Sequence, residues 1–294
     1  MSATEYRIMS VAAFFVLLLM TLGLPFGNST TSTASASVTQ PNVLAIHSMN
    51  WQTADYAQWI NQLSGSPSFG SLTLFDAENA TPTTTNLLGI DLVIISTGFD
   101  LLDTNAVGNL LADFVDRGGR VIVTTYSFAC TLDSSGPVNW GIGGRWETEQ
   151  YSPIIPAAAR GGNCATYTWD AQQQMQVTAP SSPYMANVGA IVNQGSTGNT
   201  DINTDLAFAS NATPLATWST PANLPMAAFN DRCVFAVNFY PPRVVDFLAP
   251  SNASFNQMIK NFATVPCTPR SNQTPVVDTP SSNPAPLVTA TFTG

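Results

Sequence analysis

The chain contains few charged side chains. Asp, Glu, Lys and Arg make up 9 % of its 294 residues, whereas roughly 25 % is usual for a soluble domain. Lys260 is its one lysine, and 18 acidic residues outnumber 9 basic ones, for a net charge of −9. Because nucleic acids and anionic membrane surfaces bind clusters of Lys and Arg, we expect no nucleic-acid partner.

Motifs for metals and cofactors are also missing. The sequence has no CxxC or Cys/His spacing for zinc, no DxDxDG-like loop for calcium and no GxxxxGK phosphate loop. Asp76, Asp100 and Asp103 could offer oxygen ligands to calcium, but Asp103 stands where an acid commonly begins a helix. The sequence therefore predicts no metal and no cofactor.

The N-terminal segment is strongly apolar. Arg7 is followed by 17 uncharged residues, IMSVAAFFVLLLMTLGL, and later by Ala34-Ser35-Ala36, which has the small residues that signal peptidase prefers. We predict a signal peptide over residues 1–36. The alternative is an uncleaved N-terminal anchor, the one case in which we expect contact with a membrane. Both interpretations predict a secreted or cell-surface protein.

Asparagine and cysteine usage agrees with an extracellular location. Asn-x-Ser/Thr acceptors beyond the signal predict glycosylation at Asn79, Asn211, Asn252 and Asn272. The sequence has 4 cysteines, which permit about three pairings. We favour Cys130–Cys164 and Cys233–Cys267, because each pair closes a short loop beside a predicted element.

Hydrophobic periodicity predicts one α/β domain. Residues 37–41 form a polar spacer, residues 42–266 form the domain with an irregular aromatic-rich insert at about 131–214, and residues 267–294 form a Pro/Ser/Thr-rich tail. Short apolar runs alternate with amphipathic stretches, which is typical of a doubly wound, mostly parallel flavodoxin-like sheet. The predicted strands are 43–46, 71–76, 90–96 and 120–128, followed by a late β-hairpin at 225–239.

Three helices are predicted. Thr53 and Thr104 are expected to cap two of them, whose apolar residues recur on one face. Gly118-Gly119 predicts a left-handed exit from the second helix. The third is expected to begin at Ser251 or Asn252.

The carboxyl ends of the predicted strands form the edge that we call the rim. Ligands of open parallel sheets bind outside these ends. A ligand is therefore expected to meet the residues that follow the strands: His47, Asn50, Trp51, Phe99, Tyr126, Asn238 and Tyr240.

Two stretches carry a family resemblance. DLVIISTGFDLLDTNAVGNLLADFVDRGGRVIVTTYSF and ATPLATWSTPANLPMAAFNDRCVFAVNFYPP resemble the core and the late hairpin of the class I glutamine amidotransferase-like superfamily, in its trehalose-utilisation-type branch. Active amidotransferases place a cysteine in a sharp turn after the strand that matches RVIVT, and a histidine and a glutamate after the strand that matches VFAVN. Here the turn falls on Thr125 or Tyr126, and the exit reads Phe239-Tyr240-Pro241-Pro242. The resemblance therefore implies a domain without the catalytic triad.

A replacement catalytic group is weakly indicated. Cys130 is expected to be oxidised, which leaves Ser127 as a nucleophile, His47 as its base and Asp100 as an orienting acid. In a flavodoxin-like order the strands that carry His47 and Ser127 are separated by a third strand, so their ends lie about 10 Å apart, too far for a hydrogen bond. The alternative function left open is a secreted hydrolase acting on carbohydrate or ester through an unassigned site.

The insert is rich in aromatic residues. Trp140, Trp146, Tyr151 and Trp169 lie close to Arg145 in the sequence, and aromatic faces beside polar groups suit sugar binding. The other interpretation is a satellite core that closes the rim. Taken together, the sequence predicts a non-catalytic domain that binds a glycan or an extracellular protein, or serves a structural role.

Overall fold

The computed structural model describes residues 40–66, 68–128, 140–157, 173–193, 202–220, 223–242 and 249–267, with the backbone of a few intervening residues. All of them belong to the unit that spans Thr39–Gly294. The predicted signal peptide, the tail beyond Cys267, and Cys130, Cys164, Trp169 and Asn272 lie outside the described residues. Within the described ranges, no helix is long and apolar enough to cross a membrane.

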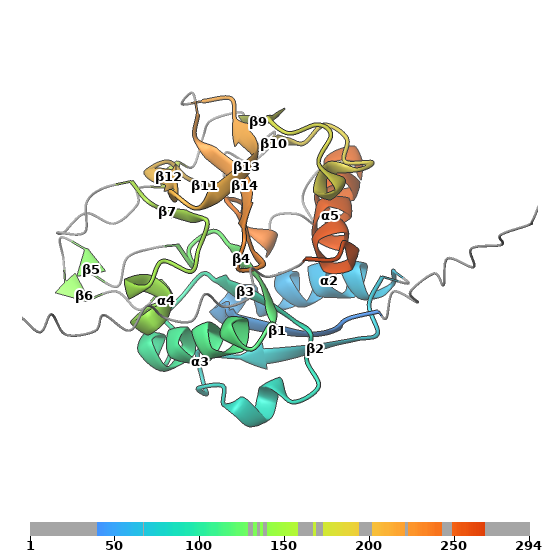
Figure 1. Cartoon of the computed structure of the whole chain (residues 1–294). Helices are drawn as coiled ribbons and strands as arrows, with labels where there is room; N and C mark the ends of the chain where they lie inside the picture. Colours follow the sequence, from blue (N-terminus) through green and yellow to red (C-terminus); the bar gives the residue numbers. More distant parts are fainter. Residues whose placement is uncertain are drawn as a thin grey trace, which may run out of the picture. The chain divides into compact units, whose positions relative to one another are not determined.

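The centre of the domain is a mixed sheet, in which nine strands of the described chain pair (Figure 1). Its parallel half has the order β2-β1-β3-β4-β15. These strands are β1 (Asn42–Ser48), β2 (Ser71–Asp76), β3 (Leu92–Thr97), β4 (Arg120–Thr124) and β15 (Val234–Val237). The antiparallel half continues from β15 with β14 (Pro225–Asn230), β13 (Ala212–Trp218), β9 (Gln173–Val177) and β10 (Val192–Asn193). The predicted doubly wound sheet with a late hairpin, β14–β15, is confirmed.

Helices cover both faces of the parallel half, which explains why β3 is buried at every residue. On one face α2 (Thr53–Ser64) packs against α5 (Ala249–Thr264), where Trp59 Nε1 donates to Asn256 Oδ1 at 2.9 Å. On the other face α3 (Thr104–Asp116) packs against α4 (Gly144–Thr148) (Figure 1). This two-faced arrangement follows from right-handed crossovers that run in opposite directions from β1.

The predicted helix caps were wrong in detail. Asp103, not Thr104, caps α3, because its carboxylate accepts from the Ala106 amide at 2.9 Å. Thr53 donates to the Asn50 carbonyl oxygen at 2.7 Å, because a 3₁₀ turn, η1 (Asn50–Gln52), precedes α2. The predicted left-handed exit is confirmed at Gly118, with a φ of 92°.

The insert contains more regular structure than its composition suggests. Two of its strands, β9 and β10, join the main sheet. The other short pairs are β7 (Ile154–Pro156) with β12 (Leu206–Phe208), β8 (Tyr167–Thr168) with β11 (Ile202–Asn203), and β5 (Leu132–Asp133) with β6 (Gly136–Pro137). The remaining 3₁₀ turns are η2 (Thr84–Leu87) and η3 (Pro183–Met185).

One disulfide is present in the described chain. Cys233 and Cys267 are bonded across a sequence separation of 34 residues, so the bond ties the β14–β15 turn to the end of α5. This confirms the second predicted pairing, while the first falls outside the described residues.

Candidate functional site

A strained turn follows β4. It spans residues 125–128, and Tyr126 has a φ of 71°, in the left-handed region. A bulky residue held there costs of order 1–3 kcal/mol, and such residues cluster at functional sites. The turn occupies the position at which the family resemblance puts a nucleophile, and Tyr126 is its strained residue.

The Tyr126 ring packs edge-on against Tyr240, which follows β15. Their ring centroids are 4.9 Å apart with an interplanar angle of 76°. Both side chains are buried, with 6 % and 1 % of their surface exposed. The Tyr240 hydroxyl donates to the Gln52 side-chain oxygen and lies 3.2 Å from Met49 Sδ. We call Tyr126 and Tyr240 the tyrosine pair; it occupies the rim between the ends of β4 and β15.

Two neighbours fix the tyrosine pair. Trp140 packs against Tyr126 with ring centroids 5.9 Å apart. Gly98 approaches the Tyr240 hydroxyl so closely that a Cβ on Gly98 would lie 2.2 Å from that oxygen. A glycine is therefore required after β3 for the Tyr240 hydroxyl to reach Gln52.

Asn238 connects the same part of the rim to the insert. Its Oδ1 accepts from Thr125 Oγ1 at 3.0 Å and from the Asn203 amide at 2.9 Å. Its Nδ2 donates to the carbonyl oxygens of Asn203 and Pro225 at 2.8 and 2.9 Å. Asn238 is fully buried, so its polar atoms are used inside the protein and do not face a ligand.

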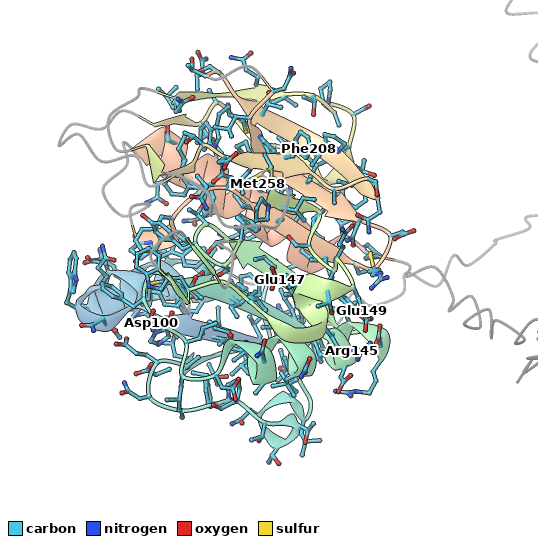
Figure 2. All side chains as sticks on the ribbon, turned by 90° about the vertical axis from the view of Figure 1, so that its left-hand side faces the viewer. Asp100, Arg145, Glu147, Glu149, Phe208 and Met258 are labelled. Carbon is cyan, nitrogen blue, oxygen red and sulfur yellow. A yellow bond between two sulfur atoms is a disulfide. The ribbon has the colours of Figure 1, made fainter. Side chains whose placement is uncertain are left out.

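The three weak catalytic candidates do not contact one another. The Ser127 Oγ accepts from the Thr97 amide at 3.2 Å and lies 3.3 Å from Thr97 Oγ1. His47 lies on β1, which β3 separates from β4, as the predicted strand order requires. Asp100 is exposed at the surface (Figure 2). No hydrogen bond or ion pair among the described residues joins any two of these three side chains.

His47 is buried beside Tyr56, with ring centroids 5.2 Å apart. Neither His47 Nδ1 nor the Tyr56 hydroxyl has a hydrogen-bond partner among the described residues. Burial lowers the pKa of His47 below its ordinary 6.5, although the carboxylates of Asp76 and Glu78 act in the opposite direction. Burial likewise raises the pKa of Tyr56, and the Ser96 side chain, which does not reach hydrogen-bond geometry with the Tyr56 hydroxyl, acts against that rise. Burial thus favours the neutral form of the imidazole, which packs against the Tyr56 ring.

A small cavity of about 30 Å³ lies beside Ser127 and Glu147, next to Trp146 and Ser152. That volume accommodates about one water molecule. A sugar ring or an ester substrate would not fit unless the surrounding side chains moved.

The aromatic side chains of the insert are mostly buried. Trp146 stacks on Tyr151 with centroids 5.5 Å apart, and they are 3 % and 1 % exposed. Trp140 is half-buried against Tyr126, and Trp169 lies outside the described residues. These contacts correspond to the satellite-core interpretation.

Arg145 is bound by acids, well away from Asp100 (Figure 2). It forms ion pairs with Asp113, with Asp116 at 2.8 Å and with Glu149 at 2.8 Å. Hydrogen bonds with Glu149 and Asp116 raise the pKa of Arg145 above its ordinary value. Its guanidinium is thus committed to carboxylates of the protein itself.

The part of the rim after β1 and β3 is exposed. We call Asn50, Trp51, Phe99, Asp100 and Leu102 the exposed lip. Trp51 is 69 % exposed and Leu102 59 %, while Trp51 contacts Phe99 edge-on with centroids 6.3 Å apart. The backbone amide and Nδ2 of Asn50 both donate to Glu78, each at 2.9 Å. Of the residues predicted to meet a ligand, Asn50, Trp51 and Phe99 reach solvent, whereas His47, Tyr126, Asn238 and Tyr240 are buried.

Acidic side chains near the rim have local partners. Asp76 accepts from the Glu78 amide at 3.0 Å and from Asn79 Nδ2 at 2.8 Å, and Asp103 caps α3. Among the residues that the structure describes, no group of three or more His, Cys, Asp or Glu side chains is placed to hold a metal ion.

The predicted glycosylation sites differ in exposure. Asn79 and Asn211 are exposed. Asn252 is half-buried, and its side chain bonds to Gln62 at 3.2 Å and to Asn256 at 2.7 Å. A glycan on Asn252 would be attached to Nδ2, the atom that donates to Gln62.

Solved structures share this arrangement of elements. No protein-family model matches the sequence, and no curated protein does. A ThuA-like protein from Bacteroides uniformis superposes with a TM-score of 0.52 at 12 % identity, covering 76 % of this chain and 91 % of that one. The chain shares the fold of this ThuA-like protein.

Two further structures are similar at lower scores. A glutamine amidotransferase from Thermotoga maritima gives a TM-score of 0.47 at 8 % identity, with 76 % of this chain and 98 % of that one covered. The glutaminase domain of a Trypanosoma brucei CTPS, with bound acivicin, gives 0.41 at 10 % identity, with 76 % and 93 % covered. At 12 % identity, the similarity to the ThuA-like protein shows a shared fold and nothing about function.

Sequence reasoning missed several residues of the site. Gln52, Glu78 and Leu102 were not predicted to take part, although each stands in a loop that follows a parallel strand. The contact between Tyr126 and Tyr240 was also missed, since neither periodicity nor spacing shows which strand ends are neighbours. The strand order β4-β15 was the information needed.

Proposed function

We propose that the chain is a secreted or cell-surface domain of ThuA-like fold that performs no catalysis and binds a glycan on its exposed lip. The observation that carries this proposal is the tyrosine pair. Its two rings occupy the position where an active relative would need a nucleophile and a base.

Acid–base or nucleophilic catalysis needs a nucleophile and a base within hydrogen-bond reach, about 2.6–3.2 Å. The tyrosine pair is in ring contact, its Tyr240 hydroxyl is bonded to Gln52, and both side chains are closed off from solvent. The nearest hydroxyl along the chain, that of Ser127, is bonded to Thr97. These contacts support a domain that has kept the strained turn but has no nucleophile and base available there.

The exposed lip offers what a sugar needs. The Trp51 ring is largely exposed, and aromatic faces of this kind stack on the C–H face of a sugar ring. Asn50 and Asp100 stand in the loops after β1 and β3, and Glu78, in the loop after β2, is bonded to Asn50; their oxygens can accept hydrogen bonds from sugar hydroxyls. The Trp51 ring also contacts Phe99, and an apolar surface that is bordered by polar groups supports a binding role.

An extracellular location is part of the proposal. The Cys233–Cys267 disulfide supports an oxidising compartment. The exposure of Asn79 and Asn211 is compatible with N-glycans.

A glycan array tests this function. The purified chain is expected to bind a limited set of glycans, and Trp51→Ala is expected to weaken that binding about tenfold or more, as loss of an aromatic anchor does. Val177→Ala is the matched control, because Val177 is also exposed, at 41 %, but lies on β9 in the antiparallel half of the sheet. It should bind as the wild type does.

Two results would reject the proposal that the exposed lip binds a glycan. If no glycan binds, but a protein partner is captured and lost with Trp51→Ala, the exposed lip serves a protein partner. If glycans bind equally to the wild type and Trp51→Ala, the binding site lies elsewhere.

A further inference from the structure

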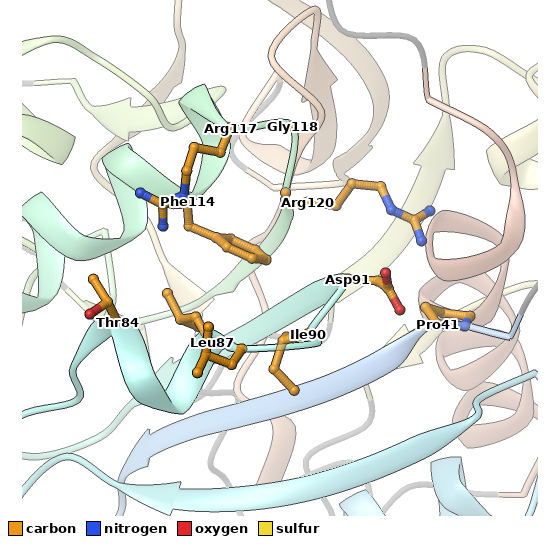
Figure 3. Close-up of a pocket in the computed structure, with 11 residues that line it drawn as sticks. Pro41, Thr84, Leu87, Ile90, Asp91, Phe114, Arg117, Gly118 and Arg120 are labelled. Carbon is orange, nitrogen blue, oxygen red and sulfur yellow. The ribbon is translucent and has the colours of Figure 1, made fainter.

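A second concave surface lies at the opposite edge of the sheet, where β1, β3 and β4 begin. It is a cavity of about 660 Å³, within the roughly 300–1,000 Å³ that is usual for small-molecule sites. The chain reaches it at Pro41, and the turn after α3 closes one side (Figure 3). The rim and its exposed lip take no part in it.

The wall of this cavity is mixed, because its apolar side chains stand beside Thr84, Asp91 and two arginines. Leu87 and Phe114 are buried, at 6 % and 5 % exposure, and Leu88 is 76 % exposed beside them. The Phe114 ring packs on Gly119 so tightly that a Cβ there would lie 2.4 Å from a ring atom. Because the ring cannot move toward Gly119, the surface that it offers to the cavity is preformed.

Two arginines flank this wall and point away from each other (Figure 3). Arg120 is committed: its Nη1 donates to the Phe262 carbonyl oxygen at 3.3 Å, and Asp91 stands close by. Burial lowers the pKa of Arg120, with Asp91 acting against that effect. Arg117 is exposed, and its guanidinium makes no hydrogen bond or ion pair to any residue that the structure describes. Of the two arginines that line the cavity, Arg117 therefore has a guanidinium without a partner among the described residues.

We propose that this cavity binds a small organic carboxylate with an apolar body, such as a medium-chain fatty acid or an arylalkanoate. The carboxylate would pair with the Arg117 guanidinium, whose planar fork matches two carboxylate oxygens. The apolar body would lie over Leu88 and over the small part of Phe114 that remains exposed. In a chain with 18 acidic and 9 basic residues, an arginine that has no partner within the described ranges favours such an anion over a cation.

The test uses the full purified chain and octanoate, with octanol as a neutral body of the same length. Octanoate is expected to bind at millimolar concentration or below and to shift the methyl resonances of Leu87, Leu88 and Ile90 in NMR spectra. Arg117→Gln should weaken octanoate binding about tenfold or more, because a charged hydrogen bond is lost. Arg117→Lys should restore part of it, and octanol should bind the wild type and Arg117→Gln equally.

Lys260→Gln is the matched control, since it removes a positive charge from α5 without touching the cavity, and it should bind octanoate as the wild type does. Arg117 is exposed, so the variants are expected to fold, which their unfolding temperatures check. No resonance shift with octanoate would overturn the proposal. Equal binding by Arg117→Gln would also overturn it. So would contacts in the unliganded protein between Phe114 and residues outside 40–267, because they would mean that another segment of the chain fills the cavity.

Discussion

The two parts of the rim differ in the burial of their side chains. Between β4 and β15 the polar and aromatic groups are buried and bonded to the protein, as the tyrosine pair and Asn238 show. After β1 and β3 the exposed lip presents Trp51 and Leu102 to solvent. Burial explains the first set as packing, whereas packing does not explain the second. Of these two parts of the rim, only the exposed lip presents a largely exposed aromatic side chain, which the proposed glycan could reach.

The largest effect is expected at Asn238. Asn238→Ala removes four hydrogen bonds and leaves buried partners unsatisfied, so the free energy of unfolding should fall by about 3 kcal/mol or more. Asn50→Gly removes an amide of the exposed lip while tolerating its φ of 44°, and should cost less than about 1 kcal/mol. Urea unfolding measures both, and equal losses would remove the contrast between the two parts of the rim.

A smaller loss is expected at Gly98. Gly98→Ala puts a methyl group against the Tyr240 hydroxyl and should cost about 2 kcal/mol through overpacking. Gly65→Ala is the matched control, because a Cβ there meets its nearest neighbour at an ordinary 3.7 Å.

A double-mutant cycle tests whether the destabilisation by Gly98→Ala comes from the contact with Tyr240. In a Tyr240→Phe background, the cost of Gly98→Ala should shrink by about 1 kcal/mol, since the clashing oxygen is gone. If the two substitutions add without coupling, the tyrosine pair does not depend on Gly98.

The smallest effect concerns the single histidine. Because the pKa of folded His47 lies below the ordinary 6.5, the unfolded chain takes up a proton near that pH and the folded chain does not. The stability that His47 contributes is present above pH 6.5 and is lost as the pH falls below it. His47→Phe keeps a ring against Tyr56 and should abolish this part of the pH dependence. Wild-type and variant curves that stay parallel across pH 6.5 would contradict a buried, neutral imidazole.

The sequence predicts the parallel half of the fold well. Its strands are uninterrupted apolar runs, as in β3, and its helices carry clear apolar stripes, as in α3. The antiparallel extension through β9 was not foreseen, because QQMQV has little β-branched or aromatic character and depends on pairing with β13.

The site was predicted in part. The family resemblance put the turn at Thr125 or Tyr126, where it is found, but the predicted strand 120–128 was too long, because β4 ends at Thr124. The left-handed φ of Tyr126 runs against local preference, and packing with Tyr240 and Trp140 accompanies it. The sequence also did not show which of the rim residues are buried. Asn238 and Trp51 are both polar or amphipathic residues just beyond a strand, yet one is fully buried and the other is 69 % exposed.

The most direct test is to incubate the purified wild-type chain with glycoside, ester and glutamine substrates. With two phenol rings packed together where proton transfer would take place, the rate should equal that of buffer alone. A rate above that of buffer, lost in Ser127→Ala or His47→Ala, would contradict the assignment of this edge as catalytically inert.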